Sequence, residues 1–235
     1  MSGISVCFCT LAIHAPYRER ARQLCADATG VPWVVLTDEP SEFADLPVRA
    51  IRHIPTGPMA IDYRQRLGPT GNSQGAAAYH DKRFALQAAL VDFNTAIFLD
   101  ADSRIVAPPP LDPFPAGLAV IPLIQKSIAA HLEACGSWRL PAFEEAARIL
   151  MGHAGALHSA RWCHETPLAV TKDGNEHRFF KAWGEGAGIL QRREQFSGEG
   201  GIIGLAAAYA GWTVNDNALA RLASVVQHEG GGPKG

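Results

Sequence analysis

Two aspartates, one residue apart, follow an apolar run in the middle of the chain. They are Asp100 and Asp102 in IFLDADSRIV, residues 97–106. Two ionised carboxylates this close repel each other and lose hydration when partly buried, so a positive partner is expected nearby. If the strand runs as far as Asp102, alternation points both side chains to one face. Carboxylates at the end of a strand suit Mg²⁺ or Mn²⁺; the alternative is a turn whose acids are solvated or pair with Arg104.

The segments that would position these acids alternate between strand and helix patterns, and the opening reads as strand, helix, strand. That order predicts a parallel pair and an α/β fold. Apolar runs predict strands at 4–10, 31–38, 47–54, in the run before Asp100, and at 116–124, with late strands at 212–216 and 223–230. Apolar residues at helical spacing predict helices at 15–29, 81–93, within 130–155, and at 198–211. Residues 66–79 are rich in Gly, Asn and Ser and predict a surface loop.

Composition excludes several classes of protein. The 235 residues are 47% hydrophobic and 19% charged, which is the profile of a folded globular chain rather than a disordered one. Lys and Arg number 21 and Asp and Glu 23, giving a net charge of -2. Because this balance provides no broad positive field, we expect no nucleic-acid partner.

The five cysteines are scattered and odd in number. Cys7 and Cys9 form a C-x-C within a strand pattern, so both should face one side of a sheet; no second pair follows that would complete a zinc site. This usage predicts a reduced, cytoplasmic setting. No uninterrupted apolar run approaches the roughly 18 residues of a membrane span, and no basic segment precedes a signal-like run. Peripheral contact with a membrane surface stays open.

The central block, DKRFALQAALVDFNTAIFLDADSRIV (81–106), resembles that of GT-A glycosyltransferases, in which a Lys-bearing helix leads into a strand ending in a D-x-D metal motif. In that family the second acid is the safer metal ligand, and the first often meets the ribose. By this resemblance Asp102 and Asp100 bind the metal, and Asp100 also contacts the donor. Lys82 or Arg83 could contact phosphate or ribose; the alternative is a solvated helix start.

Both ends of the chain extend the resemblance toward glycogenin-like, family 8-like enzymes. FCTLAIHAPYRERARQLC (8–25) is similar to their first strand and helix, where a Thr follows the strand and an aromatic stacks on the base; Thr10 and Tyr17 take those places. In QHEGGGPKG, His228 would complete the metal site and Lys234 would meet the diphosphate. The alternative for His228 is an exposed histidine near the chain end. Pro233 precedes the lysine here, and the family's following aromatic is missing.

The second half offers acceptor-side candidates. FSGEGGIIGLAAAYAGW (196–212) resembles the GT-A stretch in which an acid opens a helix beneath the transferred sugar, and Glu199 takes that place. It would bind sugar hydroxyls or act as general base; the alternative is a first-turn acid favoured by the helix dipole. Glu165 and Trp183 are weaker acceptor candidates, and Trp183 could instead belong to the core.

The resemblance implies a single GT-A-like α/β domain over 1–235, with a nucleotide-sugar half at 1–107 and an acceptor half at 108–235. It further implies Mn²⁺ or Mg²⁺, a UDP-sugar donor, and a glycan or small-molecule acceptor bearing a hydroxyl. Two alternatives remain. One is a phosphatase or phosphotransferase of the haloacid dehalogenase type, with Asp100 as nucleophile and Asp102 as acid. The other is a nucleotide-sugar binding protein without turnover.

Overall fold

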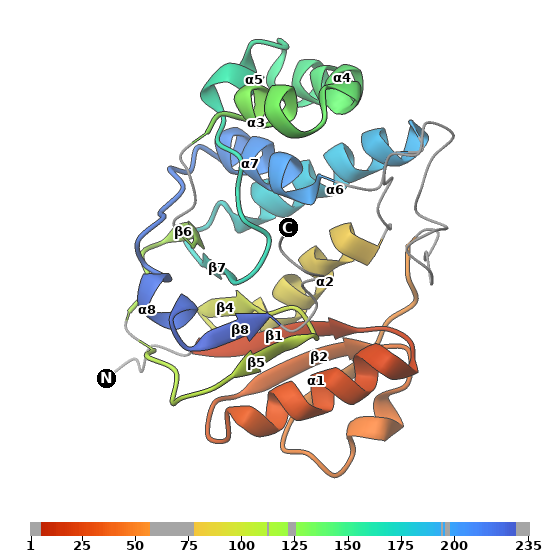
Figure 1. The fold of residues 1–235 in the computed structure, drawn as a ribbon, viewed down its shortest axis with the longest axis vertical. Helices are drawn as coiled ribbons and strands as arrows, with labels where there is room; N and C mark the ends of the chain where they lie inside the picture. Colours follow the sequence, from red (N-terminus) through yellow and green to blue (C-terminus); the bar gives the residue numbers. More distant parts are fainter. Residues whose placement is uncertain are drawn as a thin grey trace.

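The computed structural model describes residues 6–56, 78–111, 113–121, 126–193, 195 and 198–228 (Figure 1). Its strands are β1 (Val6–Ala12), β2 (Trp33–Thr37), β3 (Arg49–Arg52), β4 (Thr95–Phe98), β5 (Ser103–Ile105), β6 (Gly117–Val120), β7 (Leu168–Thr171) and β8 (Val226–His228). Its α-helices are α1 (Ala15–Asp27), α2 (Ala78–Leu90), α3 (Ile128–Cys135), α4 (Leu140–Met151), α5 (Ala156–Ser159), α6 (Glu176–Arg192), α7 (Glu199–Ala210) and α8 (Ala220–Ala223). Short 3₁₀ turns among the described residues include η1 (Pro40–Phe43) and η3 (Ser137–Arg139).

A mixed sheet of six strands forms the centre, in the order β3-β2-β1-β4-β7-β6. β1 pairs in parallel with β2 and β4, and β2 pairs in parallel with β3, whereas β7 runs antiparallel to both β4 and β6. Strands β2 and β4 are buried along their whole length, because helices cover both faces of the sheet. The predicted α/β fold is confirmed.

Two cores lie on opposite faces of this sheet. On one face, α1 packs with Phe8, Trp33 and Ile97. On the other face, Cys7 and Cys9 point into a larger core with α2, α4, α6 and α7, so the prediction that both cysteines share one buried face is confirmed. Helices α3, α4 and α5 form the layer farthest from the sheet, beyond α6 and α7 (Figure 1).

The connection after β4 differs from the prediction. The strand ends at Phe98, and residues 100–102 form a turn in which the Ser103 N–H donates to the Asp100 carbonyl at 2.9 Å. Strand alternation is therefore the wrong reason for Asp100 and Asp102 to face one site; the turn brings them together. The predicted strand at 212–216 is also wrong, because this stretch contributes only the single bridge of Asn215 to Ala119.

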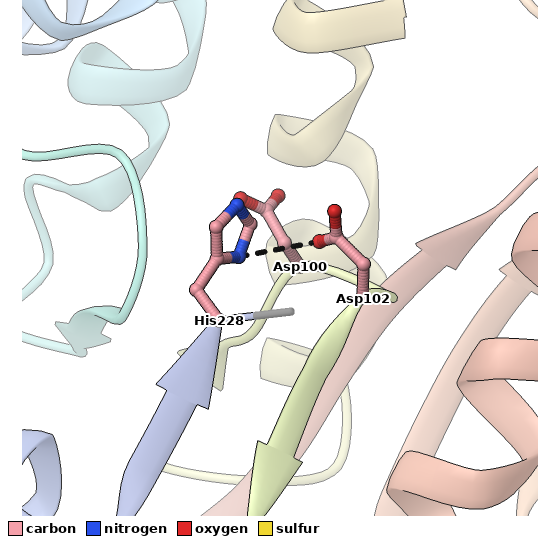
Figure 2. Close-up of side chains that lie close together, drawn as sticks. All are labelled: Asp100, Asp102 and His228. Carbon is pink, nitrogen blue, oxygen red and sulfur yellow. Dashed lines mark ion pairs between the residues drawn. The ribbon is translucent and has the colours of Figure 1, made fainter. Parts of the chain in front are cut away.

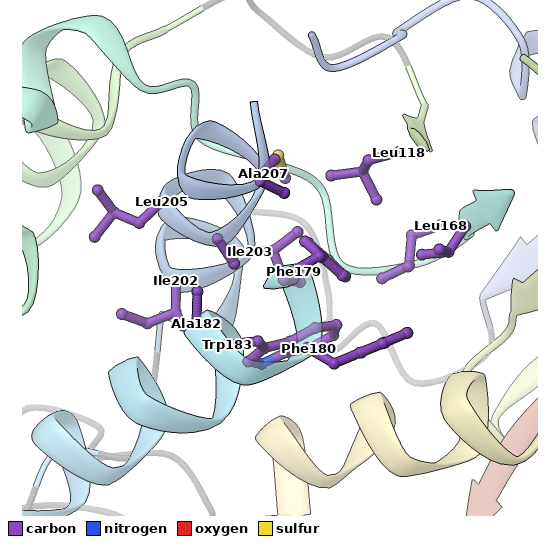
Figure 3. Close-up of a cluster of buried hydrophobic side chains, with 14 of the residues drawn as sticks. Leu118, Leu168, Phe179, Phe180, Ala182, Trp183, Ile202, Ile203, Leu205 and Ala207 are labelled. Atoms are coloured by element: carbon purple, nitrogen blue, oxygen red, sulfur yellow. The ribbon is translucent and has the colours of Figure 1, made fainter. Parts of the chain in front are cut away.

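Helix α7 is apolar on all sides and deeply buried against α6 (Figure 3). Its glycines also let the backbone before β7 approach closely: a Cβ built on Gly204 would lie 1.8 Å from the carbonyl oxygen of Arg161. Gly211, with φ of 79°, ends the helix in the left-handed conformation that glycine adopts freely. The predicted helix at 198–211 is confirmed, and its packing fixes where Glu199 lies. Within the described ranges, no helix combines the length and apolarity that crossing a membrane would require.

Candidate functional site

Three side chains that could hold a metal ion meet where β4 ends. One carboxylate oxygen each from Asp100 and Asp102 and one ring nitrogen of His228 all lie within 4.8 Å of one another. Asp100 and Asp102 come from the turn before β5, and His228 comes from the end of β8 (Figure 2). Pairing of β5 with β8 sets Ser103 opposite His228, which brings a residue from the chain's last strand beside Asp102.

The chemistry of these donors fits a divalent cation. Two carboxylates and an imidazole are ligands that Mn²⁺ accepts, and carboxylates also suit Mg²⁺. Burial, together with the neighbouring Asp100 carboxylate, raises the pKa of Asp102, and the nearby His228 only partly offsets this. The Nδ1 atom of His228 lies 3.3 Å from Asp102 Oδ1, and Nη1 of Arg20 lies 3.8 Å from Asp102 Oδ2. A cation among these three side chains would relieve the repulsion between the two acids.

Lys82 is the positive partner that the acidic pair requires. Its Nζ atom lies 3.0 Å from Asp100 Oδ1 and 3.4 Å from Glu199 Oε1, and its side chain is 8% exposed. Burial lowers the pKa of Lys82, but the Asp100 and Glu199 carboxylates outweigh it, so the pKa is raised overall and the ammonium stays charged. The solvated helix start is therefore ruled out. Arg104 is not the partner, because its Nε donates to Asp27 at 2.6 Å.

Two glutamates border this lysine. Glu199 is the first residue of α7 and its side chain is 11% exposed. The Oε1 atom of Glu165 accepts a hydrogen bond from the Gly200 N–H at 3.3 Å, which places it at the start of the same helix. Burial and the neighbouring Glu199 carboxylate raise the pKa of Glu165 to about 8, so it holds a proton at neutral pH. A protonated carboxyl group therefore lies beside the Lys82–Glu199 pair.

Four candidates from the sequence do not join this cluster. Trp183 is fully buried in the core and donates its indole N–H to His80, so the prediction that it faces a sugar is wrong. Thr10 lies within β1 rather than after it and has no exposed surface, so we leave it out of the site. Tyr17 lies in the first turn of α1 with 38% of its surface exposed, and stays a candidate. Lys234 lies outside the described residues.

One supporting residue has no signal in the sequence. The hydroxyl of Thr166 accepts a hydrogen bond from the backbone N–H of Asp100 at 3.1 Å, and so holds the turn that carries both aspartates. The two residues are 66 positions apart. An isolated threonine in an irregular segment has no periodicity or motif that would have marked it.

The comparisons with known proteins concern the fold. No protein-family model matches the chain, and no curated protein is similar to it in sequence. Among solved structures, the chain is similar to the apo form of mouse xyloside xylosyltransferase 1. The identity is 9%, the match covers 89% of this chain and 84% of that chain, and the TM-score is 0.42. An identity this low transfers no substrate to this chain.

Proposed function

We propose that this protein is a metal-dependent glycosyltransferase that moves a sugar from a nucleotide-diphosphate sugar, UDP-linked, to a hydroxyl of a glycan or small-molecule acceptor. The convergence of Asp100, Asp102 and His228 beside the buried ion pairs of Lys82 carries the proposal. The resemblance of the segments around these residues to GT-A enzymes supports it.

Each charged side chain has a role in this proposal. Asp100, Asp102 and His228 would hold Mn²⁺ or Mg²⁺, which when bound supplies positive charge to the diphosphate as the sugar leaves. Lys82 keeps Asp100 in place and provides a fixed positive charge on the side of Asp100 that faces Glu199. Tyr17, exposed at the start of α1, is the proposed contact for the base.

Glu199 and Glu165 would contact the transferred sugar and the acceptor. Glu199 lies across Lys82 from Asp100, so it is placed to bind sugar hydroxyls or to accept the proton of the acceptor hydroxyl. Glu165, which is protonated at neutral pH, is a hydrogen-bond donor beside it. Glu165 would donate this hydrogen bond to a sugar oxygen, while Glu199 contacts a sugar or acceptor hydroxyl.

The test is donor turnover by the whole chain with UDP-sugars and Mn²⁺, with and without a chelator. We expect metal-dependent UDP release, and its loss in Asp102→Asn with the melting temperature unchanged. Asp92→Asn, an exposed acid paired with Arg49, is the matched control and should behave as the wild type. Metal-independent turnover, or wild-type activity in Asp102→Asn, would refute the proposal.

The same assay separates the alternatives. Phosphate release from simple phosphoesters, lost in Asp100→Asn, would identify the phosphatase with Asp100 as nucleophile. Metal-dependent UDP-sugar binding without turnover on any acceptor would identify a nucleotide-sugar binding protein.

A further inference from the structure

Arg139 is a buried cation for which the described residues supply no ion-pair partner. It is the last residue of η3, and 9% of its surface is exposed. Among the described residues, no carboxylate lies within 4.0 Å of its guanidinium, and its buried Nε–H has no hydrogen-bond partner. Buried charges in proteins are ordinarily paired and hydrogen-bonded, because an unpaired one loses its hydration without compensation. Among the residues that the structure describes, the charge of Arg139 is therefore left for a ligand to balance.

The neighbours of Arg139 are aromatic. The guanidinium carbon lies 5.7 Å from the ring centre of Trp162 and 5.9 Å from that of Trp138. His131 stacks on Trp162 with ring centres 3.7 Å apart. Ring faces attract a cation, but they do not satisfy N–H donors that lie in the guanidinium plane. Trp138 is 40% exposed, so this group of rings reaches the surface.

Arg139 also borders the proposed site. A Cβ built on Gly198 would lie 3.3 Å from Nη1 of Arg139, so the guanidinium lies beside the residue that precedes Glu199. Following the contacts from the metal ligands, the order is Asp100, Lys82 and Glu199, and Arg139 lies beside Gly198, the residue before Glu199. The guanidinium of Arg139 therefore lies near the part of the site that is proposed to bind sugar, around Glu199. Burial lowers the pKa of Arg139, and nearby acidic groups, Glu199 among them, offset this only in part.

We propose that Arg139 binds the carboxylate of a sugar acid, with the exposed Trp138 against the sugar ring. This rests on the proposed function in that it names the class of sugar used at the same site. A guanidinium pairs with a carboxylate through two parallel hydrogen bonds, and tryptophan faces suit the apolar side of a pyranose. A carboxylate carries one negative charge and balances Arg139, whereas a phosphate monoester would leave negative charge buried near Glu199.

The carboxylate could belong to the acceptor or to the transferred sugar of the donor, and two arms of one experiment separate these sources. The first arm measures binding of methyl glucuronide and methyl glucoside, without nucleotide or metal, by calorimetry on the whole protein. The second compares UDP-glucuronic acid with UDP-glucose in the presence of Mn²⁺. A preference for the acid of about tenfold or more is expected in one arm, the size of a charge-assisted contact.

Arg139→Gln should abolish that preference, and Arg139→Lys should keep part of it. Equal binding of the acid and the neutral sugar in both arms of the wild type would overturn the proposal, and this comparison needs no variant to fold. A preference that persists undiminished in Arg139→Gln would also overturn it, as would a preference for glucose 6-phosphate over methyl glucuronide. Because the first arm contains neither UDP nor metal, it can succeed or fail independently of the transferase assay.

Discussion

The Nζ atom of Lys82 lies 3.4 Å from Oε1 of Glu199, although the two residues are 117 positions apart. This contact joins α2 to the first turn of α7, and the same ammonium lies 3.0 Å from Asp100. One buried cation thus connects the proposed metal site to the proposed sugar side. Its position makes it important for stability as well as for the proposed reaction.

Replacing Lys82 by Ala should destabilise the protein by about 3 kcal/mol, because the partly buried Asp100 and the buried Glu199 would remain without a cation. Chemical denaturation measures this change. Lys181→Ala is the matched control: Lys181 pairs with Glu185 on the exposed side of α6, and its loss should cost about 1 kcal/mol or less. Equal effects of the two substitutions would show that the buried ion pairs do not stabilise the fold.

Replacing Glu165 by Gln should change how stability depends on pH. The pKa of Glu165 is raised from 4.5 to about 8 in the folded protein, so the folded state keeps a proton that the unfolded chain releases. Its contribution to stability is therefore fully present below about pH 4.5 and is lost as the pH rises to about 8.

Glutamine keeps the contact to Gly200 and cannot ionise. Between about pH 4.5 and 8, the free energy of unfolding of Glu165→Gln should therefore fall less steeply with pH than that of the wild type. Denaturation at a series of pH values tests it, with Glu144→Gln on the exposed side of α4 as the control for lost charge. Identical slopes for wild type and Glu165→Gln would mean that Glu165 is ionised at neutral pH.

Replacing Gly204 by Ala should destabilise the protein by about 1 to 3 kcal/mol, because the added carbon would lie 1.8 Å from the Arg161 carbonyl oxygen and α7 would have to move. Gly188→Ala, in α6, is the control. Its added carbon would lie 3.7 Å from Arg192, an ordinary contact, and the substitution should stabilise the helix by up to about 1 kcal/mol. Melting temperatures of the two variants should shift in opposite directions.

Replacing Tyr17 by Ala should weaken binding of UDP in the presence of Mn²⁺ by roughly fivefold or more, as expected for loss of an aromatic contact to the base. Binding of pyrophosphate, which has no base, should not change, and calorimetry measures both. An unchanged affinity for UDP would remove Tyr17 from the site.

The sequence by itself determined the class of fold and the presence of helices α1, α2 and α7, but it did not predict β7 or the long helix α6. Alternating apolar runs and helical patterns predicted the parallel pairing of β1 with β2, and the small residues from 198 to 211 predicted α7. These features follow from local periodicity, which a reader of the sequence can see. The acid pair at Asp100 and Asp102 could also be seen in the sequence, because the two residues directly follow an apolar run. The structure shows that a turn, not strand alternation, brings their carboxylates together.

Only the tertiary structure decided which distant side chains meet those acids. Lys82, not Arg104, is the cation beside Asp100. The pairing of β5 with β8 places His228 beside Asp102, and Trp183 lies in the core. The tertiary structure also left Arg139 buried without a carboxylate in contact among the described residues. Contacts of this kind depend on how helices and strands pack across long separations in the chain. A charged or aromatic side chain has the same local pattern whether it ends in a core, an ion pair or a binding site, so its role is set by packing.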